Sequence, residues 1–153
     1  MNSELLKDSV GLIAFNEGRV LLVKNTLKSS YREEIYGAPA GRLEKGETEK
    51  QAAVREFFEE TGLTTTEDDL GDFENNCYSA EIDRKDGKKV FSIRFLRVKR
   101  FEGELKASEA TIPEWIELGK AREMNLVANV KEAIEAALHA IKREAEFGKP
   151  KIS

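Results

Sequence analysis

The chain has 153 residues, of which 40% are hydrophobic and 35% charged, and its formal net charge is −4. This balance fits one globular domain over residues 1–153 and argues against binding of a nucleic-acid polymer, although small nucleotides stay open as substrates. We expect a cytoplasmic protein without membrane contact, because no apolar stretch approaches the roughly 20 residues of a membrane span, no signal peptide precedes the domain, and the single cysteine, Cys77, leaves no internal disulfide.

The first third of the chain predicts a hairpin and a loop. Residues 9–15 and 19–23 are β-rich runs separated by three residues, among them a glycine, so we expect a hairpin with a tight turn. The polar residues 25–34 predict a loop. Residues 36–41 include Pro39, which lacks a backbone N–H donor, and they predict a short or edge strand that leads into a loop.

A helix and a second hairpin follow. Residues 48–61 are helical in character, and Gly62 is placed to end the helix. Residues 72–82 and 89–99 predict a hairpin around residues 85–87, and the second arm alternates in polarity as a half-buried strand does.

The last third predicts a loop, a strand and a helix. Residues 102–111 are polar and predict the loop, and residues 114–118 predict a short strand. Residues 129–147 predict an amphipathic helix because apolar side chains recur along one stripe. The complete order of elements predicts a mixed sheet with helices packed on it.

The segment from Gly41 to Leu63, GRLEKGETEKQAAVREFFEETGL, is the most informative part of the chain. On a helix, Glu56, Glu59 and Glu60 share one face, where like charges repel by roughly a few tenths of a kcal/mol per pair. Hard cations such as Mg²⁺ and Mn²⁺ prefer oxygen ligands and relieve such crowding. The spacing alone leaves two interpretations open, a solvated acidic face or a cation site.

The other positions of this predicted helix are largely apolar. We expect five of them to pack on the sheet: Ala53, Val54, Phe57, Phe58 and Thr61.

The complete segment favours the cation site. Gly41, five residues, Glu47, seven residues and then the run REFFEETGL at 55–63 resemble the Nudix box of the Nudix hydrolase superfamily. Phe57 stands where the family more often has an aliphatic residue. The resemblance extends over nearly the whole chain and implies an α+β fold, an α/β/α sandwich with a mixed β-sheet between helices.

The resemblance also implies an enzyme that hydrolyses a phosphoanhydride bond with Mg²⁺, or with Mn²⁺ as a substitute. The implied metal ligands are Glu56, Glu59, Glu60 and the backbone carbonyl of Ala40. The metal would bridge the diphosphate and hold a water for attack on phosphorus. The general base is then either Glu56 or Glu59, or a carboxylate from a later loop, for which Glu109 is our candidate.

Three further box residues take supporting roles by resemblance. Arg55 would pair with the box glutamates and aim them, since a guanidinium fork suits that work. Glu47 would assist the metal site, although an acid favoured by the helix dipole is an equal interpretation. Gly41 would serve backbone geometry.

The identity of Glu109 as the later-loop carboxylate is the most open of these assignments. Glu109 lies six residues before Trp115 in the polar loop, and Glu102 and Glu104 of the same loop are alternatives. A solvated loop glutamate without a role is also open. His139, the only histidine, is expected to have a surface or packing role.

The substrate class is only weakly indicated. The chain resembles the small enzymes that remove unwanted nucleoside triphosphates, and dinucleoside polyphosphates and ADP-ribose are the alternatives. Tyr78 and Trp115 are candidates for contact with the base, but core packing is the favoured interpretation of Tyr78 and an open alternative for Trp115. A catalytically silent nucleotide-binding module is disfavoured because all four box glutamates are present. A homodimer stays open.

Overall fold

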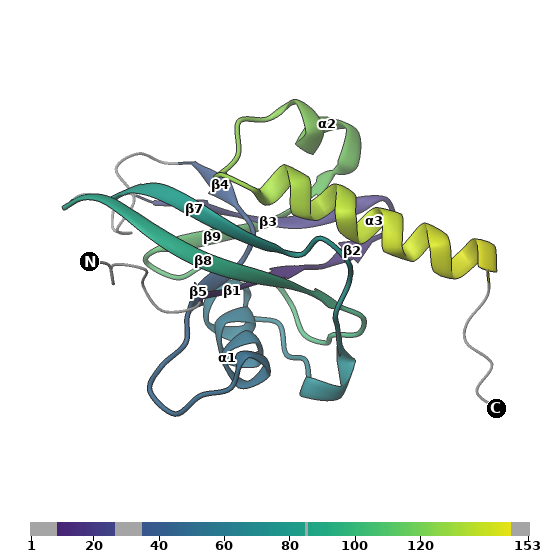
Figure 1. The fold of residues 1–153 in the computed structure, drawn as a ribbon, viewed down its shortest axis with the longest axis horizontal. Coiled ribbons are helices and arrows are strands. Elements are labelled where there is room, and N and C mark those ends of the chain that lie inside the picture. The colour runs from purple at the N-terminus through teal and green to yellow at the C-terminus, as the bar shows by residue number, and fades with distance from the viewer. Residues whose placement is uncertain (1–8, 27–34, 85, 148–153) are drawn as a thin grey trace.

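Two β-sheets lie between helices in the computed structural model, which describes residues 9–26, 35–84 and 86–147 (Figure 1). In chain order the elements are β1 (Ser9–Ile13), β2 (Phe15–Asn16), β3 (Arg19–Asn25), β4 (Tyr36–Gly37), β5 (Ala40–Arg42), α1 (Glu49–Thr61), the 3₁₀ turn η1 (Glu67–Asp69), β6 (Leu70–Gly71), β7 (Cys77–Arg84), β8 (Gly87–Val98), β9 (Thr111–Glu117), α2 (Leu118–Glu123) and α3 (Val130–Phe147). Helix α1 covers one side of the sheets, and α2 and α3 lie on the other (Figure 1). The predicted α+β sandwich is confirmed.

The larger sheet is mixed and has the strand order β5-β1-β8-β6, with β7 also paired to β8. Strand β1 runs parallel to β8, from the pair Ser9 and Ile93 to the pair Ile13 and Arg97. The other pairings are antiparallel. Strands β7 and β8 form the predicted second hairpin, whose first arm begins at Cys77 and not at residue 72.

The smaller sheet is antiparallel and corrects the prediction for the start of the chain. Residues 9–15 were expected to form one arm of a hairpin, but the strand is divided at Ala14. Only β2 turns back onto β3, through Glu17 and Gly18, both at positive φ. Strand β1 joins the mixed sheet because all five of its residues are buried, as in a strand covered on both faces.

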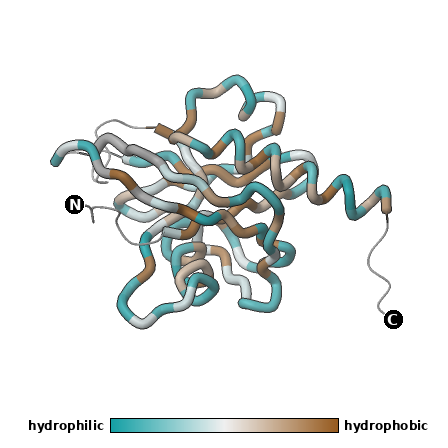
Figure 2. Tube along the Cα trace, viewed as in Figure 1, coloured by the Kyte–Doolittle hydropathy of each residue, from teal (hydrophilic) through white to brown (hydrophobic). Residues whose placement is uncertain are grey.

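Alternate residues of the central strands divide the core into two clusters. Leu12 contacts the cluster beneath α1, which contains Phe57, and its neighbour Ile13 contacts the cluster beneath α3, which contains Ile134. Figure 2 shows the hydrophobic residues gathered along the strands and hydrophilic residues on the outer loops. None of the helices in the described ranges is long and apolar enough to cross a membrane.

The helix ends follow from local sequence. Thr48 caps α1 and forms a reciprocal capping box with Gln51, and Gly62 ends the helix at φ 85°. The predicted helix 48–61 is therefore confirmed, as is the C-terminal helix, which begins at Val130. Strand β9 begins at Thr111, earlier than predicted, and the short helix α2 was not predicted.

Candidate active site

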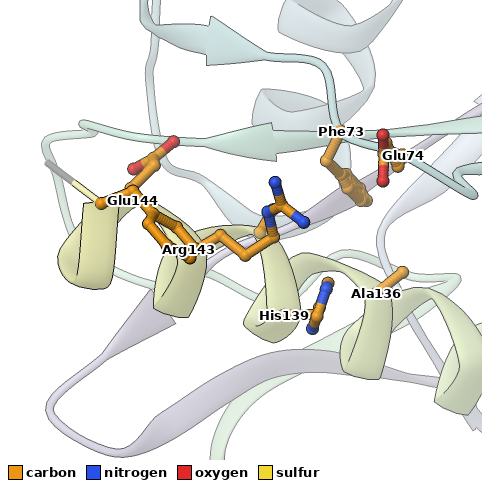
Figure 3. Close-up of a pocket in the computed structure, with 8 residues that line it drawn as sticks. Phe73, Glu74, Ala136, His139, Arg143 and Glu144 are labelled. Atoms are coloured by element: carbon orange, nitrogen blue, oxygen red, sulfur yellow. The ribbon is translucent and has the colours of Figure 1, made fainter. Parts of the chain in front are cut away.

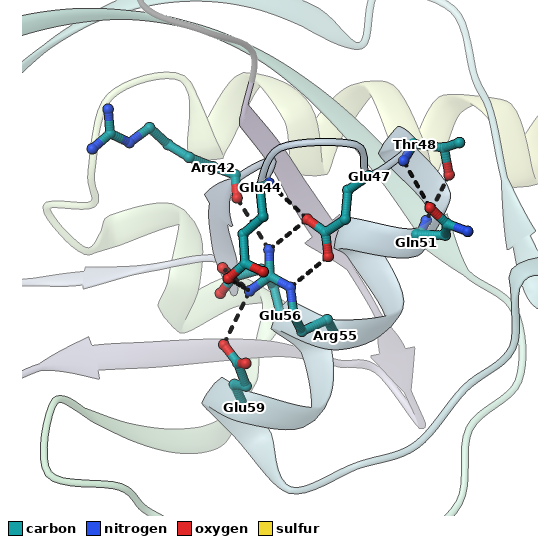
Figure 4. A network of polar contacts seen from close by, with 8 residues as sticks. All are labelled: Arg42, Glu44, Glu47, Thr48, Gln51, Arg55, Glu56 and Glu59. Carbon is teal, nitrogen blue, oxygen red and sulfur yellow. Dashed lines mark hydrogen bonds and ion pairs between the residues drawn. The ribbon is translucent and has the colours of Figure 1, made fainter.

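Arg55 is the centre of a polar network on α1 (Figure 4). Its Nε and Nη2 donate to the two carboxylate oxygens of Glu47 at 2.6 and 2.8 Å, which is the bidentate geometry of a guanidinium and a carboxylate. Its Nη1 donates to Glu56 at 2.9 Å and to Glu59 at 3.2 Å, and Nη2 also reaches the carbonyl of Arg42 at 3.1 Å. One arginine thus connects three of the four box glutamates, as the resemblance implied.

Glu60 faces away from this arginine and towards β5. Its Oε1 accepts a hydrogen bond from the backbone N–H of Ala40 at 2.9 Å. The predicted ligand set is therefore divided between two anchors, Arg55 for Glu56 and Glu59, and Ala40 for Glu60. Glu59 is the most exposed of the three, with 54% of its side chain accessible against 12% for Glu56.

Gly41 is required by the position of Glu56. A Cβ atom at residue 41 would lie 2.1 Å from Oε2 and 2.2 Å from Cδ of Glu56, closer than any real contact. Gly41 does not have a positive φ, so glycine is needed here to leave space for the Glu56 carboxylate in its present position and not for backbone conformation. This geometry gives a physical reason for the glycine that begins the box.

Burial makes two of the glutamates difficult to ionise. Burial raises the pKa of Glu60 to about 8, and the hydrogen bond from Ala40 offsets only part of this effect. Burial also raises the pKa of Glu56 to about 6 in spite of Arg55 beside it. The hydrogen bonds from Arg55 instead lower the pKa of Glu47 to about 2. Arg55 balances the negative charge of Glu47, whereas Glu56 and Glu60 have too little positive charge beside them to offset their burial.

The helix itself adds to this shortage of positive charge. Glu59 and Glu60 lie in the last turn of α1, at the negative end of the helix dipole, and that turn contains no basic residue. An acid at this end is typically unfavourable by about 0.3–1 kcal/mol. A cation placed beside these carboxylates would relieve the dipole, the mutual repulsion and the desolvation together.

The donor set fits a hard divalent cation. Carboxylate and backbone oxygens are the ligands that Mg²⁺ and Mn²⁺ prefer. Within the described residues, no three acidic, histidine or cysteine side chains are grouped as a metal site. Two of the carboxylates, Glu56 and Glu59, are instead turned towards Arg55.

Glu109 lies on a loop that is attached to the end of the glutamate helix. The Oγ1 of Thr111 donates to the carbonyl of Glu60 at 3.1 Å, and the Oγ1 of Thr26 donates to the carbonyl of Glu109 at 2.7 Å. The side chain of Glu109 is exposed. Its assignment as base or ligand stays a prediction. The sequence did not identify Thr26 and Thr111, because a threonine that bonds a carbonyl far away in the chain leaves no local pattern.

The two candidate substrate contacts lie in packed surroundings. Trp115 stacks on Phe101 with ring centroids 5.6 Å apart and packs against the cluster beneath α1. Tyr78 makes an edge contact with Phe95 and packs against the cluster beneath α3, while its hydroxyl donates to the carbonyl of Asn75. Packing accounts for both positions, and a substrate contact stays a prediction for each.

The prediction that Phe58 packs on the sheet with the apolar face of α1 is wrong. Ala53, Phe57 and Thr61 are buried as expected, but Phe58 is 54% exposed. It points off the sheet and lines a shallow hollow of about 370 Å³ together with Val54, Arg55, Glu59, Thr64 and Thr65. Phe58 directly follows the buried Phe57, and each residue of a helix turns roughly 100° from the one before it, so the ring of Phe58 leaves the packing face.

A second hollow, also of about 370 Å³, lies along α3 on the opposite side of the sheets (Figure 3). His139 and Arg143 line it from the helix, and Phe73 and Glu74 line it from the loop before β7. His139 is exposed, in line with the predicted surface role. This hollow does not contain any box residue.

Comparison with known proteins agrees with the geometry. The family model of the NUDIX domain matches residues 5–146. The 8-oxo-dGTP diphosphatase of Escherichia coli strain K12 is 33% identical over 113 residues, which are 74% of this chain and 81% of that protein. The oxidized purine nucleoside triphosphate hydrolase of Danio rerio is 29% identical over 109 residues, 71% of this chain and 65% of that protein.

Solved structures share the fold. The MutT protein from Methanosarcina mazei Go1 matches 97% of this chain and 100% of its own with a TM-score of 0.73 at 23% identity. The family match covers nearly all of the described residues, and it includes the helix on which Arg55 gathers the glutamates. The chain therefore belongs to the Nudix family and is a Nudix hydrolase.

Proposed function

We propose that this chain hydrolyses a phosphoanhydride bond of a nucleoside triphosphate and that it requires a divalent cation, Mg²⁺ or Mn²⁺ as its substitute. The observation that carries the proposal is the shortage of positive charge around Glu56 and Glu60. Burial raises the pKa values of these carboxyls to about 6 and about 8. Strongly shifted carboxyls grouped beside a strand end are typical of functional sites.

The residues divide the work between holding the cation and holding one another. Glu56, Glu59, Glu60 and the carbonyl of Ala40 would bind the cation, which supplies the positive charge that polarises the phosphorus–oxygen bonds and neutralises the diphosphate. Arg55 keeps the carboxylate of Glu56 against β5, where Gly41 leaves room for it. This positioning matters because small displacements of reacting groups reduce rates strongly.

The attacking water must lose a proton, and three carboxylates can take it. Glu56 lies beside β5, and Glu59 is exposed on the same helix face. Glu109 lies on the loop joined to the end of that helix through Thr111. The base accepts the proton while the new phosphorus–oxygen bond forms and the anhydride bond breaks.

The relatives narrow the first substrates to test. The two relatives described above carry names that refer to 8-oxo-dGTP and to oxidised purine nucleoside triphosphates. We therefore expect an oxidised purine triphosphate to be hydrolysed to the nucleoside monophosphate and pyrophosphate. ADP-ribose and dinucleoside polyphosphates contain the same bond and are the alternatives.

A substrate panel with product identification tests the proposal. The purified chain is incubated with 8-oxo-dGTP, dGTP, ATP, ADP-ribose and a dinucleoside tetraphosphate, each with Mg²⁺, with Mn²⁺ and with excess chelator. We expect cleavage of a triphosphate with release of pyrophosphate, and no cleavage with chelator. Equal turnover in chelator would contradict the metal requirement, and preferential cleavage of ADP-ribose would replace the substrate class.

A further inference from the structure

The C-terminal end of α1 is capped by a segment far away in the sequence. The last carbonyls of a helix have no partner within it and must be satisfied from outside. The carbonyl of Phe58 accepts from the N–H of Gly62, which is local. The carbonyls of Glu60 and Thr61 accept instead from the Oγ1 of Thr111 and the N–H of Lys106, at 3.1 and 2.8 Å. The loop before β9 therefore holds the turn that carries Glu59 and Glu60.

The hydroxyl of Thr111 has only one hydrogen-bonding arrangement that satisfies its partners. Thr111 is buried, and its Oγ1 lies 3.1 Å from the carbonyl of Glu60 and 3.1 Å from the Oγ of Ser108. A hydroxyl has one proton, and the Glu60 carbonyl can only accept. Thr111 therefore donates to Glu60, and Ser108 donates to Thr111.

The same turn also fixes the backbone of Glu109. The Oγ of Ser108 accepts the N–H groups of Ala110 and Thr111, at 3.2 and 3.1 Å. Thr26, the residue after β3, holds the turn from outside. Its N–H donates to the carbonyl of Ala110 at 3.0 Å, and its hydroxyl donates to the carbonyl of Glu109 at 2.7 Å. Only the side chain of Glu109 is left free to turn.

We propose that Thr111 is a positioning residue that joins the metal-binding turn of α1 and the loop of Glu109 into one unit. The proposal rests on the proposed function. Glu60 is held at both ends, its carboxylate by Ala40 on β5 and its carbonyl by Thr111 on β9. Loss of the Thr111 hydroxyl releases one end, so the carboxylate is no longer aimed at the place where the cation binds.

Direct measurement of Mn²⁺ binding tests this role without depending on catalysis. Free Mn²⁺ is followed by electron paramagnetic resonance during titration of the wild type, Thr111→Val, Thr111→Ser and Thr65→Val. Thr65→Val is the matched control, because the Oγ1 of Thr65 also donates to a backbone carbonyl at 2.7 Å, but that carbonyl belongs to Arg100, which lies outside α1 and outside the box. Hydrogen exchange of the amides in the last turn of α1 is measured on the same four proteins.

We expect Thr111→Val to weaken Mn²⁺ binding by about tenfold, the factor that corresponds to one hydrogen bond of ordinary strength. Thr111→Ser should restore the affinity, and Thr65→Val should leave it within about twofold of the wild type. Equal affinities in Thr111→Val and Thr65→Val would overturn the positioning role, even if both variants lose thermal stability.

A separate substitution tests whether the position of Glu109 matters for turnover. Thr26→Val removes the hydroxyl that holds the carbonyl of Glu109 and leaves the bond between Thr111 and Glu60 in place. We expect a lower kcat and a displaced pH profile with unchanged Mn²⁺ affinity. A wild-type kcat and pH profile would remove Glu109 from the unit.

Failure of the proposed function has a different signature. A wild type that binds Mn²⁺ but cleaves no nucleotide contradicts the proposed function and leaves the affinity comparison to decide the role of Thr111. A wild type that binds no Mn²⁺ contradicts the metal requirement and the positioning of a cation site together. Faster hydrogen exchange in Thr111→Val than in Thr65→Val supports the cap, and equal exchange overturns it.

Discussion

Helices α1 and α3 cover opposite sides of the same sheets, yet they use glutamate in opposite ways. On α3, Glu135 and Glu144 form exposed ion pairs with Arg122 and Arg97, and the hydrogen bond from Arg122 lowers the pKa of Glu135. On α1, burial raises the pKa values of Glu56 and Glu60. Surface ion pairs are satisfied by their partners and by water, whereas Glu56 and Glu60 keep raised pKa values in spite of the hydrogen bonds from Arg55 and Ala40.

The difference shows which helix folding alone can explain. Helix α3 has an apolar stripe of Val130, Ala133, Ile134 and Ala137 against the core and charges on its outer face, which is sufficient for a packed surface helix. Helix α1 also has its apolar stripe, but its acids crowd towards β5 at a cost to the metal-free fold. A fold retains such a cost where the site has a function.

Substitution of one glutamate by glutamine, first on α1 and then on α3, gives the largest expected difference in turnover. Glu60→Gln should lower turnover by about 10²- to 10³-fold, because it removes a carboxylate ligand of the proposed cation, whose positive charge stabilises the transition state. The same variant should be at least as stable as the wild type at pH 8, since it removes a buried carboxyl whose pKa is raised to about 8. Steady-state kinetics and thermal unfolding without metal measure both effects.

The matched control is Glu135→Gln on α3, which removes one partner of an exposed ion pair. Its turnover should equal that of the wild type, and its stability should change by less than about 1 kcal/mol. Turnover of Glu60→Gln within about threefold of the wild type, outside the range expected for a metal ligand, would contradict the assignment of this residue to the site.

A methyl group added to the backbone beside Glu56 gives the next largest effect. Gly41→Ala places a Cβ about where the carboxylate of Glu56 now lies, so that carboxylate has to move. We expect turnover to fall by about 10- to 100-fold, as for a displacement of about 1 Å at a reacting centre. Gly119→Ala, on α2 where no atom lies within 4 Å of the added Cβ, should leave turnover unchanged. Equal activity of the two variants would contradict the role of Gly41.

The sequence predicted those features that are encoded locally. The spacing of Glu56, Glu59 and Glu60 predicted that these residues share one helix face. Thr48 and Gly62 bound the helix in the structure, and the box predicted that Arg55 pairs with box glutamates. These features depend on residues within one or two turns of each other. Local patterns therefore sufficed for the bounds of α1 and for the pairing of Arg55, while the role of the glutamates as metal ligands stays a prediction.

Features that depend on tertiary contacts were not predicted. The division of residues 9–15 between two sheets depends on β8, which lies about 80 residues later along the chain, and on burial of both faces of β1. The link from Thr111 to Glu60 joins residues 51 positions apart. A periodic pattern within one segment carries no information about such partners.

The pH dependence of stability gives a smaller contrast between the glutamates of α1 and those of α3 than the substitutions above. Without metal, the raised pKa values of Glu56 and Glu60 mean that the folded chain holds protons which the unfolded chain releases above its ordinary pKa of 4.5. Stability should therefore fall as pH rises from about 5 to about 8. Glu47, with its pKa lowered to about 2, contributes stability that is present above 4.5 and lost as pH falls towards 2.

Thermal unfolding in excess chelator at pH 5.5 and 8.5 measures this fall, which we expect to be a few degrees, roughly the shift that 1–2 kcal/mol gives a chain of this size. Glu60→Gln should flatten the profile, and Glu135→Gln should not. Addition of Mg²⁺ should raise the Tm more at pH 8.5 than at pH 5.5, because the ligands must be deprotonated to bind it. An unchanged slope in Glu60→Gln would show that another group causes the fall.

The smallest expected effect concerns two neighbouring aromatic residues on α1 itself. Phe57 is fully buried and Phe58 is 54% exposed, so the two positions separate the packing face from the outer face. Phe57→Ala should cost about 3–5 kcal/mol of unfolding free energy. Phe58→Ala should cost less than about 1 kcal/mol and leave turnover unchanged, because its ring lines a surface hollow and is not part of the ligand set. A loss of turnover in Phe58→Ala with unchanged stability would extend the functional face of α1 to this hollow, beyond the glutamates.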